Sequence, residues 1–89
     1  MNDLHRGAIL RRLTLVSRSD CHLCDEMLAA LENLQGGFSF ALDIIDVDRH
    51  ADLAAKYSAL VPVLLDGENE ICHYFLDVDV LAAYLHRKV

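Results

Sequence analysis

The sequence is poor in basic residues, and this shortage limits its partners. It has eight Lys and Arg against fourteen Asp and Glu, for a formal net charge of −6. The basic clusters are limited to Arg11–Arg12 and Arg87–Lys88. Phosphate backbones need a basic face, so we do not expect nucleic acid as a partner. Long apolar runs are also missing: none approaches the roughly 20 residues of a membrane span, so we expect no membrane partner.

Features of secreted proteins are missing as well. Residues 1–10 mix charged and apolar residues, with no apolar stretch of signal-peptide length. Three cysteines is an odd number for a secreted disulfide framework. We therefore expect a cytoplasmic protein.

The remaining composition indicates one small domain. The chain has 89 residues, of which 54% are hydrophobic, enough for an efficient core and too many for long disorder. It contains neither an internal repeat nor a linker. We predict a single domain over residues 1–89, with residues 1–10 as a loose N-terminal arm, and we expect a monomer.

Two cysteines stand three positions apart, shortly after an apolar run that ends at Val16. On a first helical turn such residues share a face, so the sulfurs of Cys21 and Cys24 can meet as a disulfide or as two metal ligands. The unpaired N–H groups of a helix start stabilise a thiolate. We predict Cys21 as the nucleophile and Cys24 as the resolving thiol. Arg18 and a protonated His22 would lower the pKa of Cys21, while its acidic neighbours would raise it.

The apolar periodicity predicts the element order β-α-β-α-β-β-α. The single proline, Pro62, stands directly before an apolar strand, where a residue without an N–H is tolerated. Asp66–Gly67 is a hairpin signal. The expected elements are a strand over 13–16, a helix over 23–34 ended by Gly36–Gly37, a strand over 38–47, a short helix capped by Asp48, strands over 63–65 and 71–76, and a last helix capped by Asp77 or Asp79.

This order, with C-x-x-C after the first strand and Val61–Pro62 before the third, resembles the thioredoxin fold, and within it the short bacterial glutaredoxin-like proteins. The resemblance implies an α/β fold: a four-stranded mixed sheet in spatial order 2-1-3-4 with helices on both faces. It implies a cis Pro62 beside the cysteines, with the Val61 backbone presented to substrate. It also implies that Asp77 and Asp79 lie near Cys21 and contribute to substrate binding.

The sequence departs from the glutaredoxin pattern at two places that bear on ligands. His22–Leu23 stands between the cysteines in place of Pro-Tyr, and Phe75–Leu76 replaces the glycine pair that lets glutathione approach the backbone. The resemblance makes glutathione a candidate ligand, and the bulky pair weighs against it. We expect no required cofactor.

The function that the sequence favours is a thiol–disulfide oxidoreductase or redox carrier. Its partners would be a protein or small-molecule disulfide and a cellular thiol reductant. Two alternatives stay open: a module that binds zinc or an iron–sulfur cluster through Cys21 and Cys24, and a non-catalytic interaction domain. The third cysteine, Cys72, is predicted to be a small buried strand residue. The histidines have no spacing that indicates a metal site.

Overall fold

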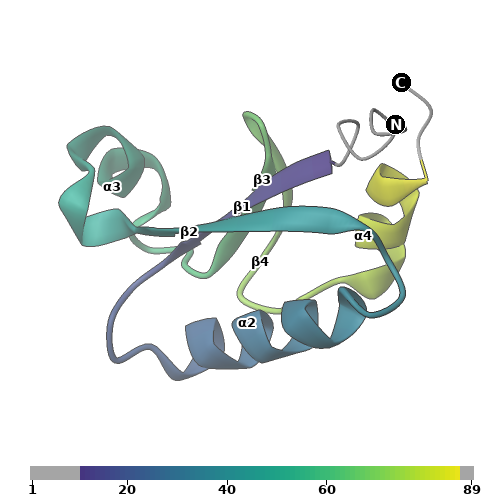
Figure 1. Ribbon diagram of the computed structural model, residues 1–89. Coiled ribbons are helices and arrows are strands. Elements are labelled where there is room, and N and C mark those ends of the chain that lie inside the picture. Colours follow the sequence, from purple (N-terminus) through teal and green to yellow (C-terminus); the bar gives the residue numbers. More distant parts are fainter. Residues whose placement is uncertain (1–10, 87–89) are drawn as a thin grey trace, which may run out of the picture.

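The computed structural model describes residues 11–86 (Figure 1). The predicted N-terminal arm, residues 1–10, lies outside the described residues, as do residues 87–89. Four strands form one sheet in the order β2-β1-β3-β4. β1 pairs in parallel with β2 and antiparallel with β3, and β3 pairs antiparallel with β4. This is the predicted mixed sheet, and the predicted fold is confirmed. The strands are β1 (Arg11–Ser17), β2 (Phe40–Asp46), β3 (Val63–Asp66) and β4 (Asn69–His73).

Helices cover both faces of the sheet (Figure 1). The helical elements are α2 (His22–Leu34), η1 (Val47–Arg49), α3 (Ala51–Tyr57) and α4 (Val78–Leu85). Successive strand side chains point to opposite faces, which divides the core into two clusters. The main cluster joins the sheet to α2 and α4, and the second joins it to α3. The main cluster contains Leu13, Leu15, Met27, Leu31, Phe40, Leu64, Ile71 and Leu81, and the second Val16, Val47, Val63 and Leu65.

Two predicted local features are confirmed: the turn at Gly67 and the Asp77 cap of the last helix. Gly67, in the β3–β4 turn, has φ 64°, a left-handed conformation that glycine adopts without a steric penalty. At the start of α4, the Asp77 carboxylate accepts a hydrogen bond from the Val80 N–H at 3.1 Å, so Asp77 is the cap. In the described residues, 11–86, no helix combines the length and the hydropathy that crossing a membrane requires.

Two predicted helix caps were wrong, although α2 ends at Leu34 as predicted. Asp48 does not cap α3: it lies in η1, where its own N–H donates to Asp46 at 3.0 Å, and His50 occupies the N-cap position of α3. The C-terminus of α2 does not use a glycine in the left-handed conformation. Gln35 ends α2 with right-handed angles (φ −62°, ψ −16°), and the chain leaves through a tight turn.

Two strands are shorter than predicted. The second begins at Phe40, and its expected burial on both faces fails at Ile44, which is 53% exposed because β2 is an edge strand. The fourth strand ends at His73, three residues before the predicted end. Tyr74 has φ 64°, which no strand accommodates, so the chain turns there.

The burial pattern predicts unequal costs for truncating two side chains in register on neighbouring strands. Leu15, on β1, is 1% exposed, and its partner on β2 is Ile44. Leu15→Ala should lower the free energy of unfolding by about 2–5 kcal/mol, because it leaves a cavity. Ile44→Ala should cost about 1 kcal/mol or less, because the side chain is half in water already. Urea unfolding followed by circular dichroism measures both, and equal losses would contradict the two-cluster core.

Candidate active site

The cysteine pair lies at the N-terminus of α2, shortly after the end of β1. Cys21 is the N-cap residue of α2, with extended backbone angles, and its sulfur accepts a hydrogen bond from the Cys24 N–H at 3.1 Å. The two cysteines form a disulfide, with their Cα atoms 5.1 Å apart. Cys24 is 3% exposed and Cys21 is partly exposed. An incoming thiol or disulfide therefore has access to Cys21, while Cys24 is enclosed, as expected for a nucleophile and a resolving thiol.

The loop that contains Val61–Pro62 lies at the same end of the sheet as the cysteine pair. Antiparallel pairing sets Val16, near the end of β1, opposite Val63, at the start of β3. Val61–Pro62 therefore lies at the end of the sheet where β1 stops and the chain continues to Cys21. The Val61–Pro62 peptide bond is cis, and Pro62 is buried.

Tyr74 fixes this loop from the other side. Its N–H donates to the Pro62 carbonyl at 2.9 Å, and its hydroxyl donates to the Ala59 carbonyl, also at 2.9 Å. The sequence pattern did not identify this contact, because apolar alternation continues from Ile71 to Leu76 and gives no sign of a turn at Tyr74.

The two residues expected to tune Cys21 have close partners of their own. The Arg18 guanidinium donates to the Asp48 carboxylate at 3.0 and 3.2 Å and to the Ser58 carbonyl and hydroxyl at 3.1 and 2.8 Å. The hydrogen bond to Asp48 raises the pKa of Arg18. The His22 side chain is 86% exposed, and its Nε2 lies 2.8 Å from Glu26. Their influence on Cys21 stays a prediction.

Asp77 and Asp79 lie at the start of α4, and both are exposed. The Asp77 carboxylate is engaged as the helix cap, and Asp79 belongs to the first turn. The contribution of both residues to substrate binding stays a prediction.

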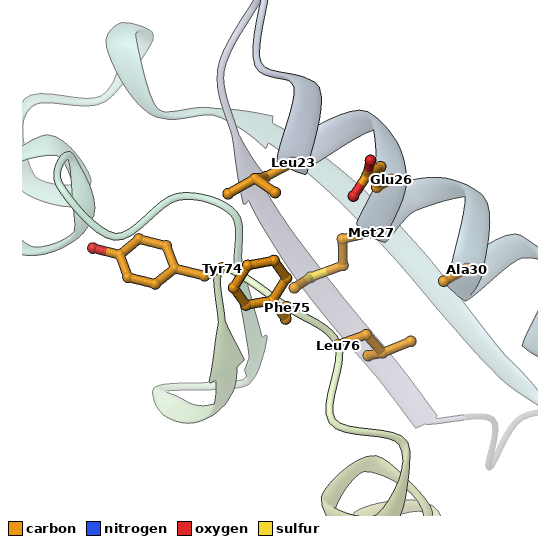
Figure 2. A pocket seen from close by; sticks show the side chains of 7 residues that line it. All are labelled: Leu23, Glu26, Met27, Ala30, Tyr74, Phe75 and Leu76. Carbon is orange, nitrogen blue, oxygen red and sulfur yellow. The ribbon is translucent and has the colours of Figure 1, made fainter.

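A pocket of about 260 Å³ opens between α2 and the chain that follows β4 (Figure 2). One wall comes from α2 and the other from the connection between β4 and α4. Leu23, which stands between the two cysteines in the sequence, is part of the first wall. The sequence analysis noticed the bulk of Phe75–Leu76 but did not predict a pocket. The lining residues are Leu23, Glu26, Met27, Ala30, Tyr74, Phe75 and Leu76.

Cys72 lies apart from the disulfide. It is partly buried in β4 and packs against the main cluster, close to the burial predicted for it. Burial raises the pKa of the Cys72 thiol, although a hydrogen bond from the Asp77 backbone opposes the shift. Across residues 11–86, no three His, Cys, Asp or Glu side chains gather in a group that could hold a metal ion.

Comparisons with known proteins extend these observations. The family model described as glutaredoxin-like domain (DUF836) matches residues 12–86. No curated protein matches the sequence.

Similar solved structures include the following three. Protein Ne2328 from Nitrosomonas europaea is 45% identical, with 85% of this chain and 92% of that chain covered and a TM-score of 0.78. Protein XcR50 from X. campestris is 37% identical, with 82% and 93% covered and a TM-score of 0.65. Thioredoxin 1 from Thermosipho africanus TCF52B, at 22% identity, 83% and 93% coverage and a TM-score of 0.57, shares the fold.

The environment of Cys72 predicts a slow thiol. All three cysteines lie within residues 11–86, and Cys72 is the one outside the disulfide. Because its pKa is raised above the unfolded value, less thiolate forms in the folded state. Iodoacetamide at about pH 8 should therefore add one group per oxidised chain, several-fold more slowly than after unfolding in urea.

The same shift links the thiol to stability. Its contribution is fully present below the pKa of the unfolded thiol and is lost as pH rises through the raised pKa of the folded one. Cys72→Ser should flatten this alkaline loss. Equal alkylation rates in the folded and unfolded chains would refute the assignment.

Proposed function

The chain belongs to the glutaredoxin-like domain family, and on that premise we propose that it is a thiol–disulfide oxidoreductase or dithiol redox carrier. One observation carries the proposal: Cys21 and Cys24 are within disulfide distance at a helix start, with Cys21 accessible and Cys24 enclosed. Structural disulfides need no such asymmetry, whereas sequential exchange does. The helix start supports the same role, because its N–H groups stabilise the attacking thiolate.

The reaction begins with the reduced pair. The Cys21 thiolate attacks one sulfur of a substrate disulfide, a bond forms between them, and the substrate S–S bond breaks. The second substrate sulfur leaves as a thiolate and takes a proton from water. Cys24 gives its proton to water, and its thiolate then attacks the Cys21 sulfur, which releases the first substrate sulfur as a thiolate and forms the Cys21–Cys24 disulfide. Two electrons have passed to the substrate, and a cellular thiol reductant returns two electrons to the protein.

The surrounding residues have separate roles in this proposal. The Cys24 N–H lies 3.1 Å from the Cys21 sulfur in the disulfide and would donate to the Cys21 thiolate of the reduced pair. The Val61 backbone lies at the same edge of the sheet and would position the substrate chain. No cofactor is needed, because the two transferred electrons are carried by the cysteine sulfurs. The chemistry suits a reducing compartment, so we place the protein in the cytoplasm.

Replacement of Cys24 by Ser separates the two steps. The Cys24→Ser chain should accumulate a mixed disulfide with a disulfide substrate, because attack proceeds and resolution cannot. Cys21→Ser should form none, since Cys24 is enclosed. Cys72→Ser is the matched control and should exchange as the wild type does. Intact mass under non-reducing conditions measures the adduct; an adduct on Cys21→Ser but not on Cys24→Ser would reverse the assigned roles.

A redox titration tests the function as a whole. In defined thiol/disulfide buffers, alkylation mass shifts should report one reversible two-electron transition between about −180 and −270 mV, the span of known carriers. A pair that stays reduced, or stays locked as a disulfide, would refute the proposal. Metal analysis of the freshly purified protein would then test whether it binds zinc or an iron–sulfur cluster. A variant with both cysteines replaced by serine would test whether the protein is an interaction domain that does not need them.

A further inference from the structure

The pocket between α2 and the β4–α4 connection, whose lining includes Leu23 from between the two cysteines, has the size of a site for one apolar side chain. An apolar cavity of about 150 Å³ holds a benzene molecule, and this pocket measures about 260 Å³. Met27, nearly fully buried, belongs to its α2 wall. Figure 2 shows Phe75 and Leu76 opposite the side chains of α2. Six of the seven lining residues are apolar or aromatic, and the seventh is Glu26.

The apolar surface continues beyond the pocket. Phe75 is 66% exposed. Of the five large apolar side chains exposed within residues 11–86, four lie between positions 74 and 80. Exposed apolar side chains that gather in one place mark interaction sites. Tyr74 and Phe75 lie in the connection that forms one wall of the pocket, and Val78 and Val80 lie in the first turn of α4, directly after it.

Glu26 lines the pocket, and three more exposed carboxylates, none of them on α2, lie within three positions of a lining residue along the chain. We call these four carboxylates the acidic rim. The rim consists of Asp20, Glu26, Asp77 and Asp79.

The lysine and arginine side chains of residues 11–86 either lie on the other face of the sheet or pair with a carboxylate. Lys56 belongs to α3, which packs on the opposite face of the sheet from α2. His22 contacts Glu26 and balances its charge only when the imidazole is protonated. The four arginines in residues 11–86 each pair with a carboxylate outside the pocket: Arg11 with Asp66, Arg12 with Asp43, Arg18 with Asp48 and Arg49 with Asp46.

The start of α4 also disfavours an anionic ligand. A helix N-terminus attracts carboxylates, but the Asp77 side chain already takes the Val80 N–H, and Asp79 adds a second negative charge in the first turn. Glutathione, with two carboxylates and one ammonium group, would bring further negative charge to this surface.

We infer that the substrate of the Cys21–Cys24 pair is a polypeptide disulfide with an apolar side chain next to its cysteine and basic residues flanking it. The apolar side chain enters the pocket between α2 and Tyr74–Leu76, and the basic residues face the acidic rim. This rests on the proposed function: the pocket and the rim select which disulfide reaches Cys21, and the exchange steps are those given above.

The experiment uses the reduced full chain and four mixed disulfides of 2-thiopyridine. Three are peptides of equal length: one with leucine beside the cysteine and lysine flanks, one with alanine in place of leucine, and one with leucine and glutamate flanks. The fourth is glutathione. Cys21 attacks the peptide sulfur and releases thiopyridone, whose absorbance gives the rate. Each rate is divided by the rate with 2-mercaptoethanol, which removes intrinsic differences in reactivity.

The leucine–lysine peptide should react about tenfold faster than its alanine counterpart, because the pocket removes one apolar side chain from water. It should react about tenfold faster than the glutamate peptide at low salt, with the advantage falling as salt is added. Glutathione should react as slowly as the glutamate peptide.

Variants assign the two preferences to their residues. Phe75→Ala should cut the leucine-to-alanine ratio to about twofold, because a pocket wall is lost. Glu26→Gln should cut the lysine-to-glutamate ratio about threefold and leave the leucine preference as it is. Ile44→Ala, an exposed apolar residue outside the pocket, is the matched control and should keep both ratios. Circular dichroism verifies that each variant folds.

The outcomes separate this inference from the proposed function. Equal rates for all four disulfides, or a leucine preference that survives Phe75→Ala, would overturn the inference and leave the oxidoreductase proposal standing. If the protein releases thiopyridone from none of the four disulfides faster than 2-mercaptoethanol does, both the inference and the oxidoreductase proposal are overturned.

Discussion

The antiparallel pairing of β1 with β3 determines where the chemistry of this protein is found. Val16 lies opposite Val63, so β1 ends and β3 begins at the same end of the sheet. The chain after β1 must turn into α2 there, and the chain before β3 must enter there. The cysteines and Val61–Pro62, forty positions apart in the sequence, are thereby brought to the same place. Both strands contribute buried side chains to the clusters on both faces of the sheet.

Local interactions then differentiate the two sulfurs. As N-cap residue, Cys21 stands outside the helix and faces its free N–H groups, while Cys24 is one turn inside, against the core. Arg18, the nearest arginine along the chain, is occupied by Asp48 and Ser58. It thereby ties the loop after β1 to the loop that precedes Pro62. The donor seen on the Cys21 sulfur is backbone, whose position is fixed by the helix and does not depend on pH.

Sequence reasoning recovered what depends on periodicity and missed what depends on tertiary contact. The hairpin at Gly67 and the cap at Asp77 follow from turn chemistry and spacing, whereas the strand order was implied by the resemblance to the glutaredoxin-like proteins; the structure has all three. The end of β4 was wrong because the apolar alternation runs on past His73. What stops the strand is the left-handed backbone of Tyr74 (φ 64°), opposite Pro62, which has no N–H to donate in return for the bond its carbonyl accepts from Tyr74. These residues are twelve positions apart, and no local pattern encodes their pairing. The pocket was missed for the same reason.

The turn at Tyr74 also connects the two parts of the candidate site. Had β4 continued to Leu76, Phe75 and Leu76 would have stayed in the sheet. Because the chain turns at Tyr74, both side chains face α2 instead (Figure 2). The same residue holds Pro62 and Ala59 by hydrogen bonds, so the wall of the pocket and the proline loop share one anchor. A glycine pair at this connection would expose backbone to a small thiol. Two bulky residues offer apolar side chains instead, and an apolar wall favours a ligand that brings an apolar group of its own.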